Sequence, residues 1–119
     1  MRPSARIPAP GLDKSVAYIV LSNPTDNPQT IVGASSECCR SIEIHETRQV
    51  DGLMQMRRLK QLLIPPNDEL ALKPGGKHLM LFGVDETVQV GDQFEISFTT
   101  TDGKSFSRSF EWVGLDAVL

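Results

Sequence analysis

The hexapeptide KHLMLF, residues 77–82, alternates between two kinds of side chain, and this alternation decides the class of fold. Successive side chains of a β-strand point to opposite faces, so His78 and Met80 would share one face. The two leucines of the hexapeptide would lie on the other face, where they can join a core. Such a strand presents a histidine and a methionine in the same direction without any unusual backbone geometry.

A second stretch, IEIHE at residues 42–46, has the same period of two. Ile42 and Ile44 would take one face of a strand, while Glu43 and His45 would take the other. His45 is therefore expected to point away from the side on which its isoleucine neighbours are buried.

Residues 50–52 predict a turn, after which Met54 and Met56 would share one face of a strand over residues 53–58. A competing interpretation is one or two helical turns from Met56 to Leu63, ended by the two prolines that follow. The strand is favoured.

The rest of the chain also divides into short apolar or alternating stretches that are separated by turn residues. The further strands are predicted at residues 16–21, 30–33, 69–72, 93–100 and 106–112. We expect about seven to nine strands in an all-β domain, either a two-sheet sandwich or a Greek-key barrel. Residues 1–11, rich in proline, are expected to form a flexible N-terminal arm, and residues 12–119 a single β-domain.

The composition sets limits on function. The chain has 119 residues, of which 39% are hydrophobic and 23% charged, and its net charge is −3. These values are typical of a soluble domain, with no basic patch for nucleic acid and no apolar run of the ~20 residues that span a bilayer. The N-terminus has no apolar stretch of the kind found in secretion signals. Either the protein is cytoplasmic, or this chain is a mature domain without its leader.

The only two cysteines, Cys38 and Cys39, are adjacent. A disulfide between neighbours would be strained, so a structural disulfide is not expected, and no zinc spacing is present. Two small, half-buried residues are the favoured interpretation. A thiolate role in metal capture or redox chemistry is the alternative.

Both histidines and every methionine except Met1 lie in the two stretches that begin at residues 41 and 77. Ten residues separate His45 from Met56, twenty-one separate Met56 from His78, and Met80 follows one residue later. Thioethers bind hard cations poorly, whereas soft Cu(I) accepts thioether sulfur together with imidazole nitrogen. Each residue alone is more often a core or surface residue, but the four together indicate a Cu(I) site.

This spacing resembles the signature of the bacterial PCu(A)C copper chaperones, and the surrounding residues match the family from about Arg6 to Val113. The matching segments are Ala17-Tyr18, Leu21–Asn23, Gly33–Ser36, Ile44–Thr47, Gly52–Arg57, Pro74–Leu81 and Gly91-Asp92.

The resemblance implies a cupredoxin-like β-barrel that binds Cu(I) through His45, Met56, His78 and Met80. Met54, two residues from Met56 on the same strand face, is the reserve, auxiliary ligand. The resemblance also implies a periplasmic protein that delivers copper toward the CuA site of cytochrome c oxidase, directly or through a thiol-containing assembly factor. Some relatives carry a methionine after the first histidine and a His- and Met-rich tail. This chain has Glu46 at the first position and no such tail, so a second copper site is not expected.

Alternative functions are a copper-tolerance or sequestration protein and a non-catalytic β-sandwich interaction module. A blue-copper electron carrier is disfavoured, because neither cysteine lies at suitable spacing from the histidines. No catalytic arrangement of side chains is visible, so the chain is predicted not to be an enzyme. Glu43 or Glu46 could orient His45, although a solvated carboxylate is the favoured interpretation for both.

Overall fold

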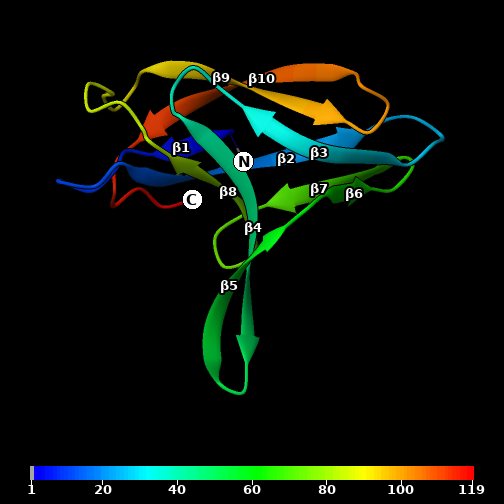
Figure 1. The fold of residues 1–119 in the computed structure, drawn as a ribbon, viewed down its shortest axis with the longest axis horizontal. Coiled ribbons are helices and arrows are strands. Elements are labelled where there is room, and N and C mark those ends of the chain that lie inside the picture. The colour runs from blue at the N-terminus through cyan, green and yellow to red at the C-terminus, as the bar shows by residue number, and fades with distance from the viewer. Residues whose placement is uncertain (1) are drawn as a thin grey trace.

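The computed structural model describes residues 2–119, and those residues form ten β-strands and no helix (Figure 1). The strands are β1 (Ser4–Arg6), β2 (Lys14–Asn23), β3 (Gln29–Ser35), β4 (Ser41–Val50), β5 (Leu53–Leu59), β6 (Leu62–Ile64), β7 (Asp68–Leu72), β8 (Lys77–Phe82), β9 (Gln93–Thr100) and β10 (Ser105–Val113). The all-β prediction is confirmed. The count exceeds the predicted seven to nine because two three-residue strands, β1 and β6, are too short to show a periodic pattern.

The strands follow one hydrogen-bonded path in the order β5-β4-β8-β2-β1-β10-β9-β3-β6, with β7 paired to β2 beside that path. Figure 1 shows this path folded over on itself into two layers, with β9 and β10 along the top and β6 and β7 below. All pairs are antiparallel except β1 with β10. The fold is therefore an all-β sandwich built from one continuous hydrogen-bonded path.

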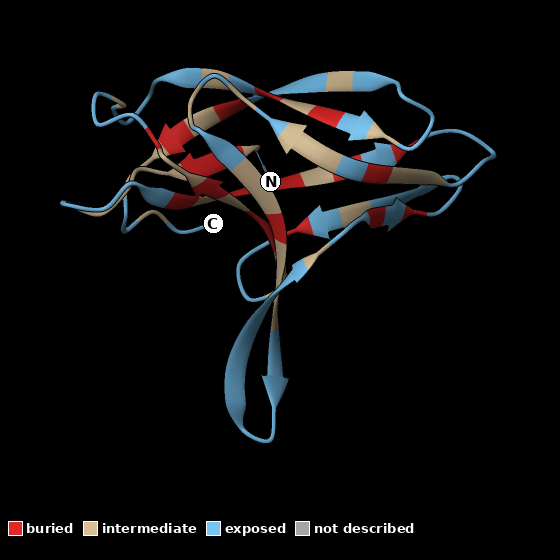
Figure 2. Cartoon of the chain, viewed as in Figure 1, coloured by how far each residue is buried: buried red, intermediate tan, exposed pale blue. Residues whose placement is uncertain are grey.

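The core fills the space between the layers, where Figure 2 shows the buried segments. Its largest fully buried side chains are Trp112, Phe98 and Phe110. Phe94 stacks on Trp112 with ring centroids 4.4 Å apart. These aromatic residues lie on β9 and β10, which confirms that the final hairpin is structural core.

The N-terminal segment differs from the flexible arm expected over residues 1–11. Ser4–Arg6 form β1, which lies between β2 and β10 in the sheet, and Ala5 is fully buried there. Proline-rich sequence does not prevent a three-residue strand between the prolines, and the sheet supplies partners on both sides. Met1 lies outside the described residues, and the division of the chain at residue 12 stays a prediction.

The β4–β5 hairpin extends away from the sandwich as an arm whose outer half is exposed (Figures 1 and 2). Its turn is made by Asp51 (φ 52°) and Gly52 (φ 79°), both in the left-handed region that a two-residue type I′ turn requires. The predicted turn and the strand over residues 53–58 are confirmed, and the helical interpretation is wrong. In residues 2–119 no helix has the length and apolarity needed to cross a membrane.

Candidate metal centre

The two histidines face each other across a pair of neighbouring strands. In the antiparallel register of β4 and β8, His45 is directly opposite His78, and their ring centroids are 5.9 Å apart. Met80 is opposite Glu43, two residues along each strand, and therefore lies on the same face as both rings. The structure thus brings together three of the four predicted ligand residues on one face of β4 and β8.

The fourth predicted ligand comes from the exposed arm. Met56 on β5 is opposite Thr47 on β4, and Thr47 lies two residues beyond His45 on the same face. Met56 is therefore a diagonal neighbour of His45, with its side chain 53% exposed, and Met54 lies one step further toward the turn. All four predicted ligands and the auxiliary Met54 consequently share one face of the three strands β5, β4 and β8.

Each histidine ring has one nitrogen engaged by a neighbour and one nitrogen without a partner. The Nε2 of His45 donates to Glu43 Oε1 at 3.0 Å, and the Nδ1 of His78 donates to the carbonyl of Gly76 at 3.2 Å. The remaining atoms, His45 Nδ1 and His78 Nε2, are buried and have no hydrogen-bond partner within residues 2–119. A buried lone pair without a partner is costly unless a ligand uses it. Two such nitrogens on facing rings fit a metal ion.

The electrostatics of His78 favour the form that binds metal. Burial lowers the pKa of His78, and the nearby His45 ring lowers it further, against the opposing effect of the Gly76 hydrogen bond. The neutral imidazole, which alone has a free lone pair, is therefore stabilised over the imidazolium.

A short turn holds the His78 ring in place. The carbonyl of Gly76 accepts hydrogen bonds from both the His78 ring and the backbone N–H of Thr47 on β4. The turn itself is closed by bonds between Lys73 and both Lys77 and Gly76. The Pro-Gly-Gly sequence before His78 thus positions the imidazole as well as connecting β7 to β8.

Glu43 orients His45, whereas Glu46, the other glutamate near His45 on β4, does not. Glu43 accepts the His45 hydrogen bond, which lowers the pKa of its carboxyl, and Arg58 lies 3.5 Å from its other oxygen. Glu46 points to the opposite face of β4. There it pairs with Arg48, Arg57 and Lys77. The expectation of a solvated carboxylate is therefore wrong for Glu43. The acid–x–histidine spacing on a strand, which places both side chains on one face, is the signal that points to this contact.

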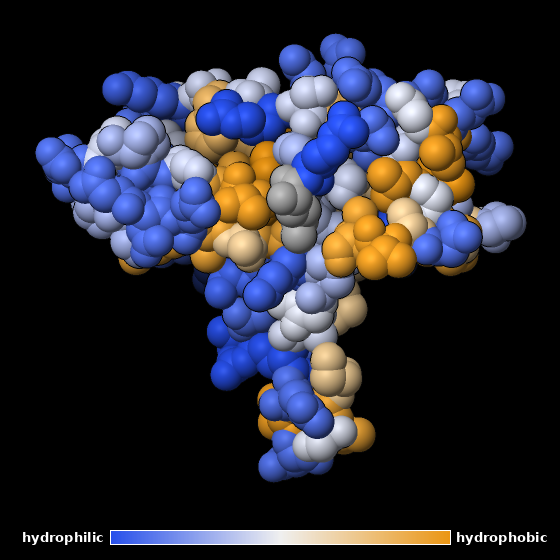
Figure 3. Space-filling view, turned by 180° about the vertical axis from the view of Figure 1, so that it is seen from behind, coloured by the Kyte–Doolittle hydropathy of each residue, from blue (hydrophilic) through white to orange (hydrophobic). Residues whose placement is uncertain are grey.

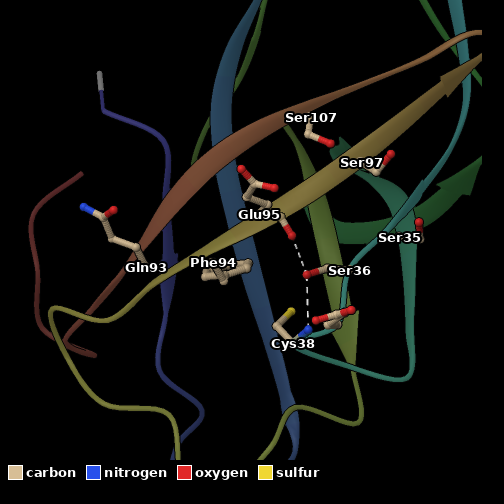
Figure 4. Close-up of a pocket in the computed structure, with 9 residues that line it drawn as sticks. Ser35, Ser36, Cys38, Gln93, Phe94, Glu95, Ser97 and Ser107 are labelled. Atoms are coloured by element: carbon tan, nitrogen blue, oxygen red, sulfur yellow. Dashed lines mark hydrogen bonds between the residues drawn. The ribbon is translucent and has the colours of Figure 1, made fainter.

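The cysteines lie apart from these ligands, in the loop before β4. Cys38 and Cys39 are free and half-buried, pack against the core, and have their sulfurs 2.9 Å apart. The Cys39 thiol beside it lowers the pKa of Cys38 to about 7, while the same contact raises the pKa of Cys39. Cys38 also lines a surface hollow with Ser36, Phe94 and the backbone of Glu95 (Figure 4). None of the predicted copper ligands lines this hollow.

The donor atoms also limit which metal ion the candidate site can bind. Within residues 2–119 no group of three or more His, Cys, Asp and Glu side chains is placed to hold an ion. Zinc and the harder cations require such groups. The thioethers of Met54, Met56 and Met80 are the soft donors that share a face with the two imidazoles.

Comparison with solved structures identifies the class of this fold: it is the cupredoxin-like fold of PCuAC domains, as the resemblance implied. The copper-bound PCuAC domain from PmoF2 has a TM-score of 0.77 at 21% identity, covering 95% of this chain and 89% of that one. Cu(I)-bound DR1885 from Deinococcus radiodurans has a TM-score of 0.75 at 27% identity, covering 94% and 75%.

Sequence comparison places the chain in a particular family. The family model "Putative lipoprotein LpqE-like" matches residues 1–111, so the chain belongs to the LpqE-like family. "Putative lipoprotein Lxx21020" of Leifsonia xyli subsp. xyli is 29% identical over 102 residues, which cover 85% of this chain and 61% of that protein. Protein RP573 of Rickettsia prowazekii is 32% identical over 92 residues, which cover 76% and 51%. The chain thus spans little more than half the length of these relatives.

Proposed function

We propose that this domain is an extracytoplasmic copper(I) carrier that binds one Cu(I) through His45, Met56, His78 and Met80, with Met54 in reserve. The observation that carries the proposal is the pair of buried, unpartnered imidazole nitrogens on the facing rings of His45 and His78. Two thioethers on the same face complete a soft, neutral donor set, which favours Cu(I) over other first-row ions.

The similar proteins support both the metal and the compartment. One is described as a copper-bound PCuAC domain and another as Cu(I)-bound DR1885, and their fold is the fold of this chain. The family and the Leifsonia relative are described as lipoproteins, which are exported. Methionine sulfur stays a ligand in an oxidising compartment where thiolates are lost to disulfides, so a periplasmic location suits the donor set.

The geometry suits transfer of copper and not catalysis. His78 is buried and His45 is half-buried, and Gly76 and Glu43 orient their rings, so we infer that they anchor the ion. Met56 lies on the exposed arm, where an incoming ligand can displace its thioether first. The acceptor we propose is the CuA subunit of cytochrome c oxidase or a thiol-containing assembly factor, and ligand exchange with it needs no covalent chemistry on the protein.

A Cu(I) competition titration on the purified, reduced protein tests this function. We expect one Cu(I) per chain, and a weaker affinity when Met56 or Met80 is replaced by leucine, which keeps the volume but removes the sulfur. The His78→Ala variant should lose most of its affinity. Val90 serves as the control, because it is 60% exposed and lies outside β4, β5 and β8, so Val90→Ala leaves the four ligands intact and should bind as the parent does. Unchanged copper uptake by His78→Ala would instead favour a non-catalytic interaction module.

A second titration separates delivery from sequestration. A carrier should release its ion to a small thiol acceptor within minutes, whereas a copper-tolerance protein should retain it. Retention of Cu(I) against an acceptor of higher affinity would contradict delivery while leaving the copper site itself intact.

A further inference from the structure

The β4–β5 arm has a charge opposite to that of the rest of the molecule. Residues 43–60, which include the carboxylates that face the cations across the hairpin, contain four cations and three carboxylates, which give a net charge of +1. Because the whole chain carries −3, the remaining residues carry −4. The cations are Arg48, Arg57, Arg58 and Lys60, and the carboxylates are Glu43, Glu46 and Asp51.

The cations on the face of the arm opposite the proposed ligands are only partly neutralised by neighbouring carboxylates. Arg48, Arg57 and Lys77 surround the single carboxylate of Glu46, at distances of 3.4 to 4.0 Å. The Arg48 and Arg57 side chains are 51% and 61% exposed. Three cations against one anion leave an excess positive charge that faces solvent.

The end of the arm is also apolar. The exposed large hydrophobic residues include Val50, Leu53, Met54 and Met56, of which Leu53 and Met54 are 66% and 65% exposed. Figure 3 shows hydrophobic side chains at the end of the projection, with hydrophilic ones between them and the body. Apolar residues rimmed by polar ones, projecting from a folded body, are typical of interaction sites.

The arm is continuous with the proposed copper site. Met56 belongs to the arm, and it shares its face with His45 and with Met54. A protein that removes copper from this face must therefore contact the arm. The surface of that protein would lie beside the positive charge of the arm, which favours an acidic surface.

We propose that the exposed part of the β4–β5 hairpin with the residue after it, residues 47–60, is the docking surface for an acidic copper-acceptor protein. The exposed arginines attract the acceptor, and the apolar residues beside the turn pack against it while Met56 is exchanged. This inference rests on the proposed function, because it names the partner of the same site.

The test uses two synthetic Cu(I)-binding peptides that share the same pair of cysteines, one flanked by glutamates and the other by lysines. Transfer of Cu(I) from the loaded domain is followed by stopped flow at low and high salt. We expect the acidic peptide to be at least about tenfold faster at low salt, and the two rates to converge at high salt, because steering between exposed charges is screened. Arg48→Glu together with Arg57→Glu should abolish or reverse the preference.

The matched control is Lys104→Glu, a charge reversal in the β9–β10 turn, which should leave the preference unchanged. Cu(I) affinity is measured first for every variant. A domain that binds no Cu(I) would contradict the proposed function, whereas a domain that binds Cu(I) but transfers it equally to both peptides would overturn only the docking inference.

Vesicles with and without phosphatidylglycerol test the alternative that the β4–β5 arm binds a membrane surface. Binding to anionic vesicles that is lost in Leu53→Asp, without a peptide preference, would assign the arm to a membrane surface instead.

Discussion

At the scale of single residues, the two histidines are already oriented for the metal that we propose they bind. Each ring uses one nitrogen to fix its orientation, through Glu43 or Gly76, and leaves the other nitrogen buried and free. Such second partners set the tautomer and the direction of a ligand ring. Glu43 and Gly76, which are not among the proposed ligands, therefore fix the geometry of the proposed site.

Glu43→Gln should weaken Cu(I) binding, because the amide no longer carries the negative charge that accepts the hydrogen bond of the His45 ring and fixes its orientation. Losses of this kind are typically about 10- to 100-fold in metal affinity. Competition titration measures the effect. Glu46→Gln is the matched control, since Glu46 lies on the opposite face and pairs with cations instead. Equal losses in the two variants would show that general charge, not the His45 contact, sets the affinity.

Folding of the metal-free domain should depend on pH through His78. Its pKa is lowered by burial in the folded state, so on acidification the unfolded chain takes up a proton first, near pH ~6.5. The stability that depends on neutral His78 is present above that pH and is lost as the pH falls through the lower folded pKa. Urea unfolding at pH 7 and pH 5 should show a smaller loss for His78→Asn than for the parent. The same loss in both proteins would refute this role for His78.

At the scale of elements, the strands and the faces on which their side chains lie can be predicted well from the sequence. The alternation in KHLMLF and IEIHE correctly places His78 with Met80, and His45 opposite the isoleucines, because a period of two belongs to the local chain. The pairing of β4 with β8, which sets His45 against His78, is a contact between segments thirty-three residues apart. No local pattern encodes it, and β1 and β6 are too short to be seen.

The junction between β8 and the loop before β4 depends on one glycine. Gly83 has φ +72°, and a Cβ at this position would lie 2.7 Å from the Cβ of Arg40. Gly83→Ala should therefore destabilise the domain by about 1–3 kcal/mol, the range for a strained left-handed residue. Gly33→Ala is the control, because no atom lies within 4 Å of its added Cβ and its φ is not positive. Chemical denaturation checks both, and equal stability of the two variants would contradict the steric argument.

At the scale of the whole molecule, the sandwich separates structure from chemistry. The aromatic core on β9 and β10 lies in the body, while the donors lie along β4, β5 and β8, where the arm leaves it. Composition and turn signals were enough to predict an all-β domain. They could not predict that one hairpin would project from it, because projection depends on the absence of packing partners and not on the hairpin sequence.

The proposed donors come from three strands that lie far apart in the sequence. For this reason the resemblance to a family points to more of the proposed site than the local patterns of residues do. Single histidines and methionines on strands are common in cores and on surfaces, and only their fixed spacing made a joint site plausible. The orienting roles of Glu43 and Gly76 depend on side-chain directions that become visible only once the strands are in register.

X-ray absorption spectroscopy of the Cu(I)-loaded domain tests the central claim most directly, because it reports the atoms bound to the ion. We predict a mixed first shell of imidazole nitrogen and thioether sulfur, with the sulfur contribution reduced when Met56 and Met80 are both replaced by leucine. A first shell without sulfur, or one unchanged by that double replacement, would contradict a copper site built from these four side chains.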